Sequence, residues 1–123
     1  MDIKNLSIEE LRYDLSRMGV GAYHCNTYSI LVCEPLEDHI HFDGTTIFST
    51  MYAIYVSINN IVIIYRTIIY NDLQKSVMPA TVFKIDTVIK KLSMEILCEI
   101  FDGEREYEKI EVSDNTIIKD LLI

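Results

Sequence analysis

The residue types best suited to catalysis or metal binding gather in one short part of the chain. All three histidines and two of the three cysteines lie between residues 24 and 41, with an aspartate just beyond: His24, Cys25, Cys33, His39, His41 and Asp43. On one strand His39 and His41 would share a face, and a thiolate or carboxylate could complete a tetrahedral zinc site with them. A cysteine paired with a histidine could instead supply a nucleophile and its base. This cluster is the one part of the sequence that suggests an enzyme.

The spacing of these residues nevertheless matches no zinc-binding pattern. Adjacent His24 and Cys25 would point to opposite sides of a strand, and nothing marks which thiol would be activated. The chain also lacks a glycine-rich phosphate loop, an HExxH motif, a nucleophile elbow and EF-hand spacing. Three cysteines are an odd number without dense spacing, which is not typical of a disulfide scaffold. We therefore predict imidazoles on a polar loop, reduced thiols in the core, no bound metal or other cofactor, and no enzymatic activity.

The charge of the chain points to a protein partner. Acidic residues outnumber basic ones by 19 to 11, which gives a formal net charge of −8 and a pI near 4.7. This charge opposes direct binding to nucleic acid, because that affinity comes largely from Lys and Arg neutralising phosphates. It favours attraction to a basic protein.

The carboxylates concentrate in two groups. The first group contains Glu34, Glu37, Asp38 and Asp43. The second is the run from Asp102 to Asp114, in which three glutamates would share one face of a strand: Glu104, Glu106 and Glu108. Each group is interpreted either as a solvated edge kept soluble by its charge or as a docking patch for a basic protein.

A long apolar stretch predicts the centre of the fold. Between Gly44 and Asn71 the only charged residue is Arg66, in a run dominated by Ile, Val and Tyr and interrupted by Asn59-Asn60. β-Branched and aromatic residues suit a pleated sheet, and two asparagines can close a two-residue hairpin turn. The stretch therefore predicts an antiparallel hairpin with strands at about 46–58 and 61–70.

The predicted turn also sets the register and the two faces of this hairpin. It would pair Ile58 with Ile61 and Val56 with Ile63. Because side chains alternate, one face would carry residues such as Tyr52, Ile54, Val56, Ile63 and Tyr65, and the other would carry Met51, Ala53, Tyr55, Val62, Ile64 and Ile68. Both faces are apolar, whereas an antiparallel sheet commonly turns one polar face to water. The second face therefore needs a helix, another protein or a lipid over it.

A membrane span is the other interpretation of this stretch, since about twenty apolar residues would cross a bilayer. Asn59, Asn60 and Arg66 would then lie inside the bilayer, each at a cost in free energy. The first ten residues, MDIKNLSIEE, also lack the basic and then apolar layout of a secretory signal. We expect no membrane span and a soluble, cytoplasmic protein.

Two helices are predicted to pack on the hairpin. Ser7 and Glu10 form a capping box for a helix over 7–18, whose apolar stripe includes Leu11 and Leu15. A second stripe of apolar residues predicts a helix at about 86–101 with Asp86 as its cap, ending at Asp102-Gly103. This second helix is the candidate for covering one face of the hairpin.

The remaining segments are shorter. Alternating residues predict a strand at about 22–33, and a polar turn over 34–44 follows it. Pro79 can start a helix or precede a short strand at 81–85. A charged strand at about 105–112 and a short terminal helix capped by Ser113 or Asp114 complete the chain.

These elements predict one α+β domain over residues 1–123, in which an antiparallel sheet is built on the central hairpin and the two helices pack on it. Their order in a small acidic chain is similar to that of many secretion chaperones and toxin-neutralising immunity proteins, a likeness of architecture and charge that assigns no residue. The sequence thus favours a non-enzymatic acidic protein that neutralises a basic partner, as an immunity protein or antitoxin neutralises a toxin or nuclease.

The predicted partner-binding residues combine the acidic groups with two tyrosines that could anchor an interface. They are Glu34, Glu37, Asp38, Asp43, Glu104, Glu106, Glu108, Tyr55 and Tyr70. A phage or viral anti-defence inhibitor would show the same pattern. A further alternative is a small chaperone or assembly subunit that binds an apolar client segment, or a second copy in a homodimer, through the face containing Met51, Tyr55, Ile64 and Ile68.

Overall fold

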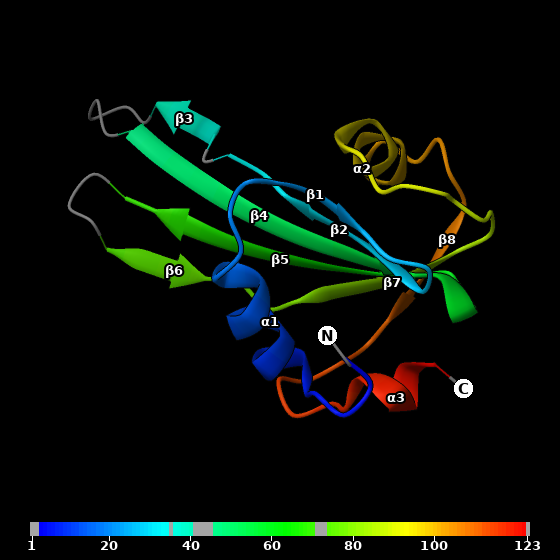
Figure 1. Cartoon of the computed structure of the whole chain (residues 1–123). Helices are drawn as coiled ribbons and strands as arrows, with labels where there is room; N and C mark the ends of the chain where they lie inside the picture. The colour runs from blue at the N-terminus through cyan, green and yellow to red at the C-terminus, as the bar shows by residue number, and fades with distance from the viewer. Residues whose placement is uncertain (1–2, 35, 41–45, 71–73, 123) are drawn as a thin grey trace.

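Two long neighbouring strands form the centre of an antiparallel sheet in the computed structural model (Figure 1). They are β4 (Thr46–Val56) and β5 (Ile61–Ile69), which confirms the predicted hairpin. The structure describes residues 3–34, 36–40, 46–70 and 74–122, and for residues 36–40 and 46–47 it describes the backbone only.

The register of the hairpin differs from the prediction by two residues. Val56 pairs with Ile61, so the predicted pairing of Ile58 with Ile61 is wrong. The chain reverses through a short 3-10 turn, η1 (Ser57–Asn59), and then Asn60 at φ 54°. A two-residue turn of the expected type needs positive φ at both central positions, whereas here only Asn60 adopts it. The Tyr55 hydroxyl donates a 2.6 Å hydrogen bond to Oδ1 of Asn60 and so joins the turn to the strand.

A shift of two residues leaves every side chain on its predicted face, because the side-chain period of a strand is two. Ile54 lies opposite Ile63, and Ala53 lies opposite Ile64. Each pair belongs to a separate hydrophobic cluster, one on each side of the sheet. Both faces are apolar, as predicted.

Six further strands extend the sheet on both sides of this hairpin, in the order β1-β2-β4-β5-β7-β8, with β3 beside the start of β4 and β6 beside the end of β5. Their bounds are β1 (Gly21–His24), β2 (Tyr28–Val32), β3 (Leu36–Ile40), β6 (Lys75–Val77), β7 (Thr81–Ile85) and β8 (Tyr107–Ile110). The single strand predicted at 22–33 is instead the β1–β2 hairpin, which turns at residues 25–27. The segment expected to be a polar turn contains β3. After Pro79 the strand alternative is the one observed.

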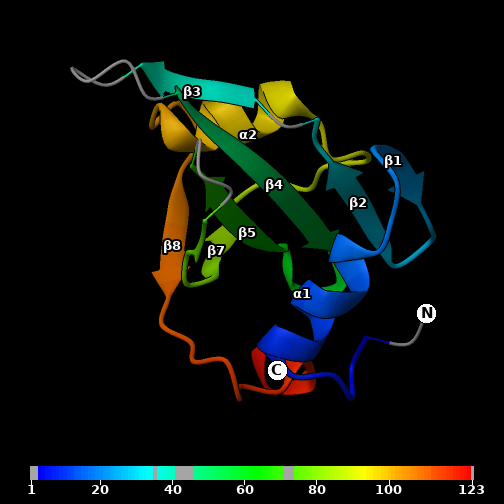
Figure 2. The same cartoon turned by 90° about the vertical axis from the view of Figure 1, so that its left-hand side faces the viewer.

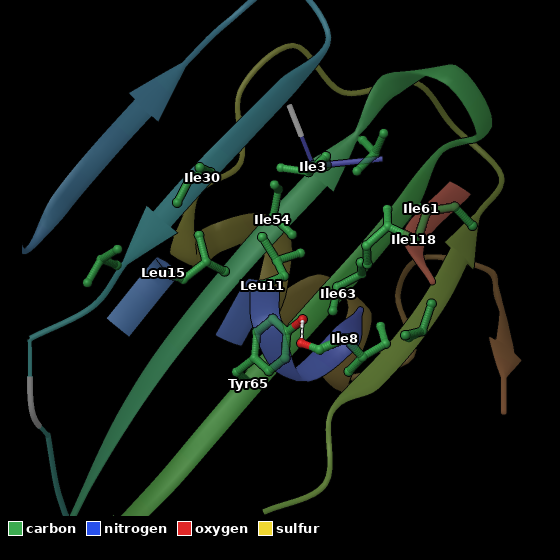
Figure 3. Packing of buried hydrophobic residues seen from close by; sticks show 13 residues of the cluster. Ile3, Ile8, Leu11, Leu15, Ile30, Ile54, Ile61, Ile63, Tyr65 and Ile118 are labelled. Carbon is green, nitrogen blue, oxygen red and sulfur yellow. Dashed lines mark hydrogen bonds between the residues drawn. The ribbon is translucent and has the colours of Figure 1, made fainter. Parts of the chain in front are cut away.

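Helix α1 (Ile8–Ser16) covers one face of the sheet. Its capping box is present, because Glu10 N donates to Ser7 Oγ at 3.1 Å and Ser7 N donates to Glu10 Oε1 at 3.0 Å. The buried Leu11 and Leu15 pack in the cluster drawn in Figure 3, and the Tyr65 hydroxyl donates to the Ile8 carbonyl at 2.7 Å.

Helix α3 (Ile118–Leu121) packs on the same side of the sheet through the buried Ile118. Its N-cap is Ile117 rather than Ser113 or Asp114, and Ile117 forms a bridge to Ser7. The N-cap of α1 and the start of α3 thus lie side by side.

Helix α2 (Met94–Phe101) covers the opposite face, so that α2 lies on one side of the sheet and α1 and α3 lie on the other (Figures 1 and 2). Its N-cap is Ser93, seven residues later than the predicted cap Asp86. The preceding segment is held in a non-helical conformation because side chains of the sheet satisfy its backbone: Leu92 N donates to Ser29 Oγ at 2.9 Å and Ile89 N donates to the Tyr55 hydroxyl at 3.4 Å. None of the helices in the described residues is long and apolar enough to cross a bilayer.

Candidate protein-docking surface

An acidic surface lies where α2 returns to the sheet as β8. We call it the acidic edge and define it as Asp86, Glu104, Glu106, Tyr107 and Glu108, all of which are exposed. The predicted strand at 105–112 is shorter than expected and starts at Tyr107. Glu104 and Glu106 therefore lie before β8, and of the three glutamates predicted to share one face of a strand only Glu108 lies within it.

The end of α2 determines how this turn leaves the helix. Gly103 has φ +75°, a left-handed conformation that favours glycine. Glu104 N donates to the Glu99 carbonyl at 2.9 Å, and Gly103 N donates to the Ile100 carbonyl at 3.2 Å. These two bonds form a Schellman motif, so the predicted helix end at Asp102-Gly103 is confirmed. The motif directs Glu104 out of the helix and into the acidic edge.

Arg105 holds the turn against the body of the protein. Its Nη2 and Nε donate to Glu99 Oε2 at 2.7 Å and 3.2 Å, and its Nη1 donates to Oγ1 of Thr87. This arrangement uses the only cation between Asp102 and Glu108 to neutralise a carboxylate of α2. Within the described part of the chain, no ion pair reaches Glu104, Glu106 or Glu108.

An exposed aromatic residue, Tyr107, lies between Glu106 and Glu108 in the sequence. Tyr107 is 47% exposed, and its ring packs edge-on against Phe83 with the ring centroids 4.7 Å apart. A shallow groove of about 280 Å³ runs along the edge, lined by Lys84, Ile85, Asp86, Glu106, Tyr107 and Glu108. Three carboxylates against one lysine leave this groove negative, and the fixed tyrosine ring gives it an apolar contact surface.

The other acidic group is not assembled into a described site. Glu34 is exposed in the connection between β2 and β3. The backbone of Glu37 and Asp38 lies on β3, while their side chains, like the whole of Asp43, lie outside the described residues. Strands β3 and β8 are at opposite ends of the sheet (Figure 1). The two acidic groups are therefore separate surfaces.

The two predicted tyrosine anchors have different environments. Tyr70 follows β5 and is exposed, as an interface anchor requires. Tyr55 is only 2% exposed and packs beneath α2, where its hydroxyl bonds the hairpin turn and the segment before the helix. The prediction of Tyr55 as a surface anchor is wrong, because the face on which it lies is covered from within the chain.

Cysteines and histidines are dispersed rather than clustered. Cys25 and Cys98 are exposed, and Cys33 is half-buried with its Sγ 3.2 Å from Sδ of Met94, so the prediction that the thiols lie in the core is wrong. Cys25 occupies the β1–β2 turn, and Cys98 lies on the outer side of α2 while Leu97 and Ile100 point inward. Burial raises the pKa of the Cys33 thiol, which disfavours the nucleophilic thiolate.

His24 shares a 2.8 Å hydrogen bond with Ser29, whose hydroxyl also accepts from Leu92 N. Ser29 is buried, so this pair serves to hold the segment before α2. The side chain of His39 and the whole of His41 lie outside the described residues. In the part of the chain that is described, no three His, Cys, Asp or Glu side chains are grouped so that they could hold a metal ion.

Sequence reasoning missed Tyr107 and Asp86 as parts of the acidic edge. The position of Tyr107 between Glu106 and Glu108 can be read from the sequence. The position of Asp86 next to Glu106 cannot, because it depends on the pairing of β7 with β8, beyond which Asp86 N donates to the Glu106 carbonyl at 3.4 Å. Comparisons of the chain with protein-family models, with curated proteins and with solved structures found no match.

Proposed function

We propose that this chain is a non-enzymatic binding protein that neutralises a basic protein partner, in the manner of an immunity protein or antitoxin acting on a toxin or nuclease. The acidic edge is the proposed docking surface. The observation that carries the proposal is the set of three exposed glutamates at 104, 106 and 108, which have no ion-pair partner among the described residues and neighbour the exposed Tyr107 in sequence.

The physical case rests on desolvation and steering. Lysine or arginine side chains of a partner could pair with carboxylates that no internal cation already neutralises, so an internal ion pair would not have to be broken first. Complementary charge also raises the rate of encounter. Tyr107 adds a ring whose position is set by Phe83, and rigid aromatic side chains are frequent anchors of interfaces.

The chaperone or assembly alternative loses part of its surface. Of the face proposed for it, Tyr55 and Ile64 are buried beneath α2 and the segment before it, while Met51 and Ile68 stay half-exposed. An apolar client or a second copy would have to use the exposed end of the hairpin only. An anti-defence inhibitor of phage or viral origin would use the acidic edge in the same way as an immunity protein, so that alternative concerns the partner rather than the surface.

The test compares two triple charge reversals on the affinity-tagged chain. One replaces Glu104, Glu106 and Glu108 with Lys, and the matched control replaces Glu37, Asp38 and Asp43, so that the net charge changes equally. Protein from the native source is passed over each tagged chain, and the retained partner is identified by mass spectrometry and then purified. Circular dichroism spectra establish that each variant is folded.

We expect a basic partner on the wild-type chain and on the control, with little or none on the Glu104 variant. Binding should weaken between 0.1 M and 1 M salt, because the Debye length falls from about 10 Å to about 3 Å. The purified partner should lose its harmful activity when the wild-type chain is added. Equal retention by all three chains, or retention that strengthens in high salt, would exclude the acidic edge and favour apolar contact through the half-exposed residues Met51 and Ile68.

A further inference from the structure

A groove separates α1 from the end of the sheet that lies farthest from the hairpin turn. Its volume is about 400 Å³, and its walls come from α1 on one side and from β4, β5 and β6 on the other. It shares no residue with the groove of the acidic edge. Pockets of a few hundred Å³ are of the size that holds small ligands.

The innermost charged group of this groove is the guanidinium of Arg12. Arg12 is only 8% exposed, and it lies over the ring of Tyr65 with its Cζ 4.9 Å from the ring centroid. Its Nη2 donates to the Met78 carbonyl at 2.7 Å, and its Nε donates to Oε2 of Glu9 at 3.0 Å. Three contacts from three elements therefore fix its position at the wall of the groove.

One donor of this fixed guanidinium is unused. Nη1 of Arg12 is buried and has no hydrogen-bond partner among the described residues. A buried donor without an acceptor is unfavourable, and the cost is larger when the group is charged. Because Arg12 lines the groove, an acceptor that enters there could complete the hydrogen bonding of the guanidinium.

The other lining residues suit an anionic head group with an apolar body. Lys75 adds a second cation, so two cations face one carboxylate, that of Glu9. Thr50 and Thr67 lie opposite each other across β4 and β5 and both line the groove. Val77 and Tyr13, which are 56% and 62% exposed, form apolar parts of the rim.

We propose that this groove binds a small amphipathic ligand with a carboxylate or phosphate head group, which Arg12 and Lys75 hold while its apolar body lies against the rim. The groove has more cationic than anionic lining residues although the chain as a whole is acidic. Binding of a ligand there is independent of docking at the acidic edge. In the proposed complex the head group pairs with the guanidinium of Arg12, and Thr50 and Thr67 offer hydroxyl donors to its oxygens.

The test uses four probes of eight carbons each that differ in head group: octanoate, octyl phosphate, octanol and octylamine. Binding is measured by titration calorimetry and by the movement of backbone amide resonances in the full chain. We expect the two anions to bind, with the amide signals of Thr50, Thr67 and Val77 moving, and to bind at least about tenfold more tightly than octanol or octylamine. The tighter of the two anions identifies the head group.

Two variants examine the cations separately, with a matched control. Lys75→Ala changes an exposed residue and should weaken octanoate binding severalfold while the amide spectrum outside the groove stays unchanged. Arg12→Lys keeps the charge but removes the guanidinium, and it should lower the affinity for octanoate by about tenfold or more. Lys84→Ala removes an exposed strand lysine outside this groove and should have no effect.

Binding of octanol as tight as that of octanoate would overturn the proposal, as would movement of signals elsewhere in the chain or an unchanged affinity in Lys75→Ala. If Arg12→Lys fails to fold, Thr67→Val takes its place, because it removes a lining hydroxyl at nearly constant size. An unchanged affinity in Thr67→Val, together with an unchanged affinity in Lys75→Ala, would likewise contradict an anion site.

Discussion

The two halves of the central hairpin differ in burial. In the half next to the turn, residues 53–56 and 61–65 are all buried. In the distal half, residues 48–51 and 66–69 are half-buried or exposed. Both halves contain β-branched residues, but the distal half also contains Ser49, Thr50, Arg66 and Thr67. The difference in burial therefore comes partly from these side chains and partly from what lies beside and over each half.

The near-turn half has strands on both sides and helices on both faces. β2 and β7 pair with it, α1 and α3 pack on one face, and α2 with the segment before it packs on the other. Among the described residues, the distal half has only the short strands β3 and β6 beside it, and the groove lined by Arg12 lies on one face. An apolar stretch of sequence therefore predicts a strand within a sheet. The elements that pack beside and over the strand decide which part of it is buried.

The largest expected effect is a difference in stability between matched truncations in the two halves. Ile54→Ala removes a fully buried side chain in the near-turn half and should cost about 2–5 kcal/mol of unfolding free energy. Ile69→Ala makes the same kind of change in the distal half, where the side chain is half-exposed, and should cost about 1 kcal/mol or less. Urea unfolding of both variants gives the comparison. Equal costs would mean that the distal half is covered in solution.

Tyr65→Phe should have the next largest effect. Tyr65 is buried on the near-turn half, and its hydroxyl donates to the Ile8 carbonyl in α1 at 2.7 Å, as Figure 3 shows. Loss of this bond should destabilise the chain by about 1–2 kcal/mol. Tyr52 lies opposite Tyr65 on the same face but is half-exposed, so Tyr52→Phe is the control and should change stability little. A cost in Tyr52→Phe as large as that in Tyr65→Phe would assign the effect to the ring environment instead of the bond.

The same tyrosine predicts how stability depends on alkaline pH. Burial raises the pKa of the Tyr65 hydroxyl above its ordinary value of about 10. The folded state therefore retains a proton that the unfolded chain releases first, so this contribution is complete below about pH 10 and is lost as the pH rises further. The urea concentration at the midpoint of unfolding, measured between about pH 8 and about pH 11, should fall as the pH rises above about 10. The midpoint of the Tyr65→Phe variant should fall less steeply with pH than that of the wild-type chain. Parallel curves for the two proteins would show that Tyr65 does not cause the loss of stability.

Local signals were reliable where one segment contains all the groups involved. The capping box of Ser7 and Glu10 and the helix end at Gly103 are both present, because each depends on residues a few positions apart. The start of α2 was predicted too early, because the backbone of residues 86–93 is bonded by Ser29 and Tyr55, which are distant in sequence. The glutamates of the acidic edge were predicted because they are neighbours in sequence. Asp86 was not predicted, because it reaches the edge only through the pairing of β7 with β8.

Arg12 shows the limit of reasoning from one helix. On α1 it follows the core residue Leu11, and nothing in its own segment distinguishes it from a solvated cation. Its burial arises because Tyr65 and the Met78 carbonyl, both distant in sequence, lie against the same part of α1. The groove that it lines was not predictable from residue spacing, since its walls come from four separate elements.

Substitutions in the turn that joins the two strands separate two contributions of one residue. Asn60 adopts φ 54°, and its Oδ1 accepts the hydrogen bond from the buried Tyr55. Asn60→Gly keeps the left-handed conformation and loses the acceptor, whereas Asn60→Asp keeps an acceptor at that position. We expect Asn60→Ala, which loses both, to be the most destabilising of the three, at about 1–2 kcal/mol.

Thermal unfolding of the three variants gives the order. If Gly and Ala cost the same, backbone conformation contributes little and the bond to Tyr55 accounts for the turn. If Gly costs nothing, the left-handed residue alone sets the four-residue turn, and with it the register that keeps the near-turn half beneath both layers of helices.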